Sequence, residues 1–558
     1  MRTRFVWLLC CIAVPVGAGK APESATDRLH EAIERRQKEA EPPRTIAEHL
    51  QRLVILDPEF DPNGGSVDAL APAMRVQYEG LEPLLDIGLR DQFLGLSSDS
   101  LRSEWLRRYW VLRDPTPATA ENERWLEHQQ RVSTARQQFS TRDSTSFDDR
   151  GRFFILYGSP TGASRWSADV QEGLGYIPER LYWFYPDVVV AFECRNPPRG
   201  PWLIGTSAKG FSNRPDIRRA ATRGFADEAA GFGLPATYYD PDRVPIEATN
   251  PMAAAQAELA LVRARQVWEE RLERFELPGA PERFLWFVFD TDVFRRSGGG
   301  DSITAVPLRL EAHVQWSVQD LTYAWRDSLY TARYRLEGIL YDEDLREAGR
   351  DSYEMDLHAK RFDSTNLARL WPGQLTFAVR PGLYRLTLRL VDLGASSAGT
   401  YTTDVMVADL ASPRLALSDI QLASSITPAG DYDGSRFTKN DRLVLPNPIA
   451  VYSESQLLTA YFEIYGLTLE ANQRGRYRVS YQILPQAPAA GKRRRARKPR
   501  PTVTSSFIAE TAVACPVEEL RIDVSELPEG VFELLISLTD LVGGGETVAQ
   551  ARFTILRL

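Results

Sequence analysis

The sequence predicts a multidomain protein that combines an α+β part with an all-β part. Three observations support this fold class. Residues 20–145 show helical periodicity, the period changes to two after Asp149, and most of the chain from Pro281 onward alternates apolar and polar residues between turns. The 558 residues exceed what a single hydrophobic core organises, and a composition of 43% hydrophobic and 25% charged residues is typical of globular domains.

The last two domains are predicted to be alike because one pattern occurs twice. Gly382 begins a run that ends in Leu-Val-Asp-Leu, and Gly530 begins a similar run that ends in Leu-Thr-Asp-Leu. Short alternating strands between turns favour two tandem immunoglobulin-like β-sandwiches. The predicted segments are a signal peptide (1–18), a helical N-terminal region (19–84), a small α+β domain with an antiparallel sheet (85–250), a connecting helix (251–280), and β-sandwiches over 281–425 and 426–558.

The N-terminus is typical of an export signal. Residues 1–4 are basic, residues 5–16 are apolar, and residues 16–18 are small enough for cleavage before Gly19. The apolar run is too short to span a bilayer, so no membrane span is expected after cleavage. A lipoprotein signal at Cys10 or Cys11 is the less favoured alternative. We therefore expect a periplasmic, cell-surface or extracellular protein.

The residues before Asp149 are predicted to form helices. Residues 45–56 and 101–112 carry apolar side chains at helical spacing, and Thr116 with Pro117 is a suitable start for a third helix. Residues 206–250 lack periodicity and read as an irregular loop.

A β-rich stretch follows Asp149. Residues 153–157 are apolar and aromatic and are expected to form a strand that Gly158 and Pro160 terminate. Residues 181–185 and 188–192 are expected to form a hairpin, and residues 202–204 a further strand.

The clearest strand lies at residues 308–318. Leu308 to Val318 alternate with polar residues that include Glu311 and His313, which predicts one face on a core and one face in water. His313 is therefore expected on the surface.

Few motifs point to chemistry. The five histidines do not occur at HExxH spacing, no phosphate-binding loop is present, and the net charge of −8 argues against a nucleic-acid binder. Asp431 and Asp433 alternate like Ca²⁺ ligands, but a linker is the favoured interpretation. Cys194 and Cys515 are expected to be buried free thiols after signal cleavage. We predict no metal and no cofactor.

Two clusters remain as candidate sites. Asp149, next to Asp148, and Glu193 supply an acid/base pair for hydrolysis, although helix capping and ion pairing are the favoured roles. A basic run near the C-terminus is suited to a polyanion, although a solvated loop is the favoured interpretation. The run comprises Lys492, Arg493, Arg494, Arg495, Arg497, Lys498 and Arg500.

The stretch from Asp114 to Pro160 resembles the bacterial GWxTD-domain proteins. The resemblance rests on Asp114-Pro115-Thr116-Pro117, Asn122-Glu123, and the motif residues Asp149, Arg150, Gly151, Arg152, Tyr157, Gly158 and Pro160. Residues 145–149 keep only the final Asp of the family signature, with Phe147 in place of the Trp if one residue is deleted. The resemblance covers residues 85–240, and residues 461–465 are similar to a stretch in the family's β-rich C-terminal regions. It implies export and supplies no catalytic mechanism.

The functional hypothesis is therefore an exported bacterial envelope or secreted protein with a binding or assembly role. Its partner is expected to be an unknown protein or cell-surface component, and a non-enzymatic role is favoured. The alternatives are an envelope hydrolase that uses Asp149 and Glu193, and a polyanion-binding protein that uses the basic run.

Overall fold

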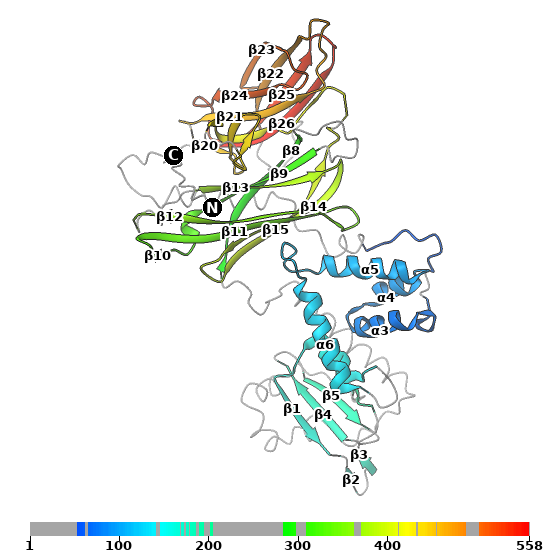
Figure 1. Ribbon diagram of the computed structural model, residues 1–558. Helices are drawn as coiled ribbons and strands as arrows, with labels where there is room; N and C mark the ends of the chain where they lie inside the picture. Colours follow the sequence, from blue (N-terminus) through cyan, green and yellow to red (C-terminus); the bar gives the residue numbers. More distant parts are fainter. Residues whose placement is uncertain are drawn as a thin grey trace, which may run out of the picture. The chain divides into compact units, whose positions relative to one another are not determined.

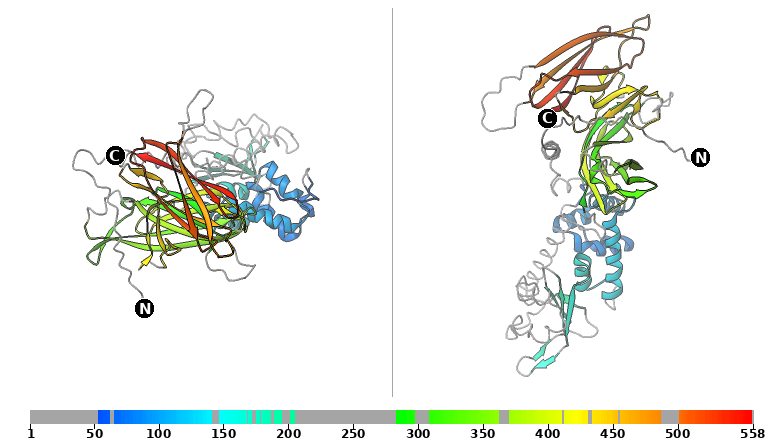
Figure 2. Two further views of the ribbon diagram at one scale, coloured as in Figure 1. Left: turned by 90° about the horizontal axis from the view of Figure 1, so that it is seen from above. Right: turned by 90° about the vertical axis from the view of Figure 1, so that its left-hand side faces the viewer.

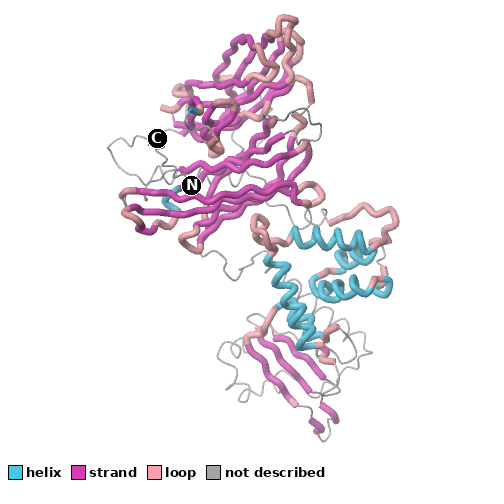
Figure 3. The backbone as a smooth tube through the Cα atoms, viewed as in Figure 1, coloured by secondary structure: helices cyan, strands magenta, loops and turns pink. Residues whose placement is uncertain are grey.

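The structure is a computed structural model, and its described residues fall into two compact units, one before residue 278 and one after residue 279 (Figure 1). The first unit combines helices with a small sheet, and the second is built from strands (Figure 3). The described residues are 53–61, 65–140, 146–167, 169–171, 175–177, 179–185, 189–194, 201–204, 283–296, 308–361, 370–410, 412–430, 434–453, 455–486 and 501–556.

The first unit begins with helices that polar side chains cap. Asp86, Ser98, Asn122 and Asp148 each accept a backbone N–H in the first turn of the helix that follows. The helical segments are η1 (Val67–Ala69), α3 (Pro72–Leu81), η2 (Glu82–Leu84), α4 (Ile87–Gly95), α5 (Asp99–Leu112), α6 (Glu123–Phe139) and α7 (Asp149–Tyr157).

Two helix predictions need correction. α6 begins at Glu123 with Asn122 as its N-cap, so Thr116 does not start it; the Thr116 hydroxyl instead bonds the Glu123 carboxylate. The described end of the predicted helix over residues 45–56, residues 53–56, is not helical. At α6 the Asn122 cap decides the boundary, which propensity alone does not fix.

The sheet of the first unit has the order β1-β4-β5-β6, and β4 and β5 form the predicted antiparallel hairpin. Its strands are β1 (Gly162–Trp166), β4 (Glu179–Phe184), β5 (Val189–Cys194) and β6 (Leu203–Ile204), with a separate hairpin of β2 (Asp169–Gln171) and β3 (Gly175–Ile177). One core extends from Leu53 through the helices to Trp202. The predicted boundary between residues 84 and 85 therefore falls within a continuous core.

The second unit contains two β-domains that repeat one strand order. In the first β-domain one sheet contains β11, β14, β15 and β7 in that order, with β10 and β12 also on β11, and the other has the order β13-β9-β8. Its strands are β7 (Arg283–Phe284), β8 (Phe287–Arg295), β9 (Leu308–Ser317), β10 (Ala324–Arg326), β11 (Leu329–Tyr341), β12 (Glu347–Ala359), β13 (Leu370–Val379), β14 (Gly382–Asp392) and β15 (Ser397–Val407).

In the second β-domain one sheet has the order β23-β22-β25-β26-β20, whose later strands lie side by side in orange to red in Figure 2. The other contains β24, β21 and β17, extended by β16, β19 and β18. The strands are β16 (Ala416–Leu417), β17 (Gln421–Pro428), β18 (Thr438–Lys439), β19 (Arg442–Pro446), β20 (Val451–Ser453), β21 (Leu457–Tyr465), β22 (Gly475–Pro485), β23 (Val503–Thr511), β24 (Val517–Asp523), β25 (Gly530–Asp540) and β26 (Glu546–Leu556). The predicted boundary at 425/426 falls inside β17.

Each β-domain has its own core between its two sheets. Leu310 and Phe377 of one sheet pack with Leu336 and Leu388 of the other in the first β-domain. A separate core in the second β-domain contains side chains from β21 and β24 on one side and β22 and β25 on the other. In the described part of the chain, no helix has the length and hydropathy that a bilayer crossing requires.

Candidate functional site: the buried polar face of β9

A dense group of buried charged side chains lies on the polar face of β9. Sequence alternation predicted that this face contacts water and that His313 lies at the surface. The structure contradicts both predictions: the exposed fractions are 3% for Glu311, 1% for His313 and 8% for Gln315. Strand β9 is buried on both faces, because its apolar residues line the core of the first β-domain and its polar residues lie against the second.

Side chains from both β-domains cover this face. On β8, Asp292 lies across from Glu311 and Phe294 across from Arg309. The second β-domain contributes Lys439 from β18 and Glu463 from β21. An apolar cluster beside the charges also joins the two domains; it comprises Phe294, Ala423, Ile426, Val444 and Tyr461. We call Asp292, Arg309, Glu311, His313, Lys439 and Glu463 the β9 polar cluster.

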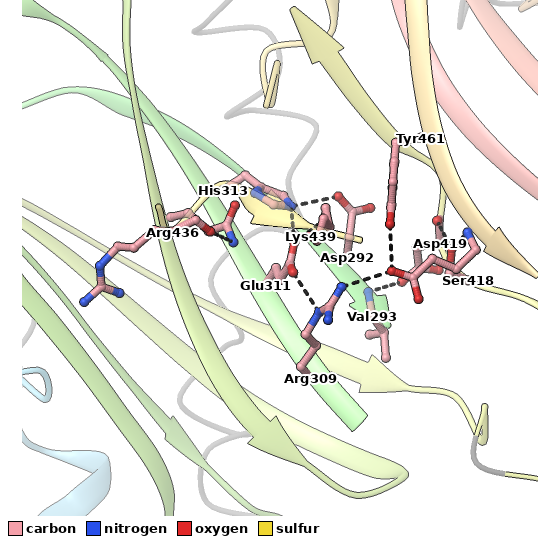
Figure 4. Close-up of polar contacts among 12 residues, drawn as sticks. Asp292, Val293, Arg309, Glu311, His313, Ser418, Asp419, Arg436, Lys439 and Tyr461 are labelled. Atoms are coloured by element: carbon pink, nitrogen blue, oxygen red, sulfur yellow. Dashed lines mark hydrogen bonds and ion pairs between the residues drawn. The ribbon is translucent and has the colours of Figure 1, made fainter. Parts of the chain in front are cut away.

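Three ion pairs connect the cluster (Figure 4). Arg309 Nε lies 2.9 Å from Glu311 Oε1, and Arg309 Nη2 lies 3.0 Å from Glu463 Oε1. Lys439 Nζ lies 2.5 Å from Glu311 Oε2, with both side chains 4% exposed. Two of these pairs, Arg309–Glu463 and Lys439–Glu311, link one β-domain to the other.

Neutral donors complete the surroundings of Glu463. The Tyr461 hydroxyl donates to Oε1 at 2.9 Å, the Tyr465 hydroxyl donates to Oε2 at 2.7 Å, and Asn440 Nδ2 donates to Oε1 at 2.9 Å. A buried carboxylate with this many donors remains satisfied without water.

The charges in the cluster determine the ionisation of Glu311. Burial alone would raise the pKa of Glu311, but the positive charges of Lys439 and Arg309 lower it below the ordinary value. Lys439 Nζ also lies 3.8 Å from the centre of the Phe294 ring, where a cation is stabilised by the ring face. Glu311 is therefore held as a carboxylate between two cations.

His313 gives the cluster donor types that metals prefer. Its Nε2 lies 3.0 Å from Asp292 Oδ2 and 3.6 Å from Glu311 Oε2. The Lys439 ammonium, however, lies against the same Glu311 oxygen, and a divalent cation would have to displace it. Among the described residues no group of three His, Cys, Asp or Glu side chains is arranged to hold a metal ion.

Asp419 adds a titratable contact to the same junction. It follows β16, and its Oδ2 accepts a hydrogen bond from the Val293 backbone N–H at 2.8 Å. Burial, together with the neighbouring carboxylates Asp292 and Asp290, raises the pKa of Asp419 to about 7, although the Val293 hydrogen bond opposes the shift. Protonation of this carboxyl relieves repulsion at the junction.

The acidic residues considered for hydrolysis lie at the start of α7 and on β5, and Asp148 and Glu193 each pair with an arginine. Asp148 is the N-cap of α7, lies 2.8 Å from Arg150 Nη2, and accepts the Trp202 backbone N–H at 3.1 Å. Asp149 lies in the first turn of α7, where a negative charge stabilises the helix. Glu193 pairs with Arg180 at 3.3 Å, and both side chains are buried.

The remaining motif residues form a helix, which corrects the predicted strand over residues 153–157. Gly151 packs on Phe147, and a Cβ at this glycine would lie 2.5 Å from the Phe147 Cβ. Gly158, with φ of 76°, ends the helix, and Arg131 donates to the Ile155 and Leu156 carbonyls there. Capping at both ends and burial of most of the helix override the β propensity of Phe, Ile and Tyr.

The last motif residues lie beside the sheet. Tyr157 contacts the Tyr185 ring at 5.0 Å between centroids, the Tyr185 hydroxyl donates to the Gly158 carbonyl at 3.1 Å, Arg152 lies 3.7 Å from Glu82, and Pro160 is partly buried. These contacts tie α7 to its neighbours.

Several predictions lie outside the described residues: the signal peptide, the loop over 206–250, the connecting helix, Asp431 and Asp433, and the basic run from Lys492 to Arg500. Cys194 is buried as predicted, but Cys515 is exposed, so that part of the prediction was wrong. Comparison with known proteins gives no assignment: no protein-family model matches the chain, and no curated protein matches it.

Sequence reasoning missed the β9 polar cluster because a strand buried by a second domain alternates just as a half-exposed strand does. The available signal was on β21, where Tyr461, Glu463 and Tyr465 alternate with apolar residues in the same way. The polar faces of β9 and β21 are complementary. Each carries a carboxylate, which has cations beside it on β9 and tyrosines beside it on β21.

Proposed function

We propose that this chain is an exported bacterial protein of the GWxTD-domain type whose role is binding or assembly, and that its two β-domains act as one rigid spacer. The observation that carries the proposal is the pairing of Arg309 with Glu463 and of Lys439 with Glu311. Buried ion pairs contribute little net stability, but they penalise any arrangement that separates their partners. They are therefore suited to fixing how two domains meet.

The β-domains are proposed to be immunoglobulin-like. The order β23-β22-β25-β26 corresponds to the C′, C, F and G strands of that fold, and β17-β21-β24 corresponds to A, B and E. At the start of β14 the Tyr384 hydroxyl donates to the Arg380 carbonyl at 3.0 Å, which is the contact of a tyrosine corner. Such domains commonly serve as spacers and binding modules.

The assignment to the GWxTD type draws support from the packing of the motif. Asp148 caps α7, Gly151 admits the Phe147 ring, and Gly158 terminates the helix, so these three positions have a local structural reason. A Gly151→Ala variant should lose about 1–3 kcal/mol of stability through overpacking against Phe147. Thermal unfolding followed by circular dichroism measures this loss, and an unchanged melting temperature would remove the structural account of the motif.

The hydrolase alternative is tested on the purified full chain. Asp149→Asn and Glu193→Gln variants are compared with the unaltered chain on a panel of glycans and peptides. The binding role predicts no turnover that depends on these carboxylates. Turnover that both substitutions abolish, with folding retained, would replace the binding role with catalysis.

Export and polyanion binding have separate tests. N-terminal sequencing of the chain secreted by a bacterial host should begin at Gly19, and a retained Met1 in the cytoplasmic fraction would contradict export. Deletion of residues 491–501 should leave heparin elution unchanged if this run is a solvated loop. Loss of retention would favour the polyanion-binding role.

A further inference from the structure

Strand β23 ends the five-stranded sheet of the second β-domain. It spans Val503–Thr511 and, among the strands that the structure describes, pairs only with β22. Its side chains are exposed on both faces of the sheet: Phe507, across from Val479, is 36% exposed, and Ile508, across from Arg478, is 50% exposed. An edge of this kind offers one row of backbone hydrogen-bonding groups to another strand.

The composition of β23 does nothing to discourage pairing. Residues 503–509 contain no charged residue and no proline, and Glu510 is the only charge in the strand. Natural edge strands are commonly protected by lysines, other charges, prolines or bulges. β23 has neither charges nor prolines over its first seven residues.

The corresponding edge of the first β-domain is protected. Strand β12 occupies the same place beside β11 that β23 occupies beside β22. It carries Arg350, Asp351, Glu354 and Asp356, and cross-strand pairs join Arg333 to Asp356 at 2.9 Å and Arg335 to Glu354 at 2.5 Å. The edge strands β12 and β23 thus occupy equivalent positions in the two β-domains but differ sharply in charge.

We propose that β23 is an interaction edge at which two copies of this chain pair antiparallel and join their sheets. Twofold pairing centred on Ser506 or on Phe507 sets Glu510 opposite Thr502 or Thr504 of the second copy, so that like charges do not meet. The second copy would then cover Phe507 on one face of the joined sheet and Ile508 on the other face. Pairing with a second copy is favoured over pairing with a foreign strand, because β23 carries so little charge that two copies bring no like charges together.

The association should be weak and dependent on concentration. A single pair of nine-residue strands buries less area than a standard stable interface. The proposal adds a partner surface and does not depend on the junction between the β-domains.

Sedimentation velocity of the full chain at increasing micromolar concentrations tests the pairing. The unaltered chain should shift from monomer to dimer. Ile508→Glu should raise the dissociation constant by about tenfold or more, because it gives β23 a charge that Arg478 can pair within the monomer and that opposes a second strand. Val548→Glu is the matched control: Val548 is 57% exposed on β26, which β25 and β22 separate from β23 in the same sheet, and this variant should dimerise as the unaltered chain does.

A cysteine variant identifies the contact itself. In a Cys515→Ser background, Ser506→Cys or Phe507→Cys places a cysteine opposite its own copy when the twofold axis is centred on that residue, and one of the two variants should give a disulfide-linked dimer under mild oxidation. Circular dichroism checks that each variant is folded. A chain that stays monomeric at all concentrations, or a dimer that Ile508→Glu leaves unchanged, would overturn the proposal; a foreign strand would then be the remaining occupant.

Discussion

The two β-domains share a strand order but place their polar residues differently. In the first, the polar face of β9 is charged and buried, whereas its edge strand β12 carries exposed ion pairs. In the second, strand β21 faces β9 with tyrosines and Glu463, and the edge strand β23 is almost uncharged. The difference teaches that the fold is set by shared core positions, while the relation to neighbours is set by the residues outside the core.

The shared positions are also visible at the strand ends. Asp392 accepts the backbone N–H groups of Thr322 and Gly394, and Asp540 accepts those of Thr468, Val542 and Gly543. Both aspartates close the strand that begins with a glycine of positive φ, 152° at Gly382 and 156° at Gly530. Tyr384 in the first β-domain is matched by Phe532 in the second, which has no hydroxyl to form a corner.

The largest expected effect is that of breaking the junction. Lys439→Met leaves the Glu311 carboxylate buried without its closest cation, and we expect a loss of about 3–5 kcal/mol in the free energy of unfolding. Hydrogen exchange of the full chain in increasing denaturant measures the loss in peptides of both β-domains. Arg333→Met is the control, because its pair with Asp356 is exposed and its removal should have little effect. Equal losses for the two variants would contradict a special role for the junction.

The second effect depends on pH. The pKa of Asp419 is about 7 in the folded chain and near its ordinary value when unfolded, so the folded state holds the proton more tightly. Its contribution to stability is complete below about pH 4 and is lost as pH rises to about 7, by as much as about 4 kcal/mol.

Asp419→Asn should remove this dependence. The stability difference between the unaltered chain and the variant, measured by denaturant unfolding at several pH values, should decline from pH 4 to 7 and remain flat above that. A difference that is constant with pH would show that Asp419 ionises normally.

The third effect tests whether the repeated aspartates are equivalent. Backbone N–H donors hold the pKa of Asp540 below its ordinary value although burial opposes them. Asp392→Ala removes the acceptor of two backbone N–H groups and Asp540→Ala that of three, and each should cost about 2 kcal/mol. Thermal unfolding of the two variants compares them directly. A marked difference between them would limit the likeness of the domains to strand order.

The smallest effect concerns the corner. Tyr384→Phe removes the hydroxyl that bonds the Arg380 carbonyl. The variant has at this position the same residue type as Phe532 in the second β-domain. The expected cost is about 1 kcal/mol, measured by denaturant unfolding. No loss would mean that the hydroxyl bonds equally well to water.

Local patterns predicted much of the fold. The repeat of Gly382 and Gly530, the β4–β5 hairpin and the alternating strands follow from turn residues and period-two patterning. The helix α7 was not predicted by local patterns, because capping by Asp148 and Gly158 outweighs the β propensity of residues 153–157. The burial of Glu311 and His313 could not be predicted, because it depends on a second domain that meets β9 through residues more than a hundred positions away.

The most direct test of the central claim measures the distance between the β-domains. Spin labels at Met406→Cys and Val548→Cys, both at exposed positions, report it in the full chain with Cys515→Ser. We predict that pulsed electron–electron double resonance gives one narrow distance distribution for the unaltered chain. Lys439→Met should broaden this distribution. A broad distribution in the unaltered chain would contradict the account, because the β9 polar cluster would then not hold the two domains together.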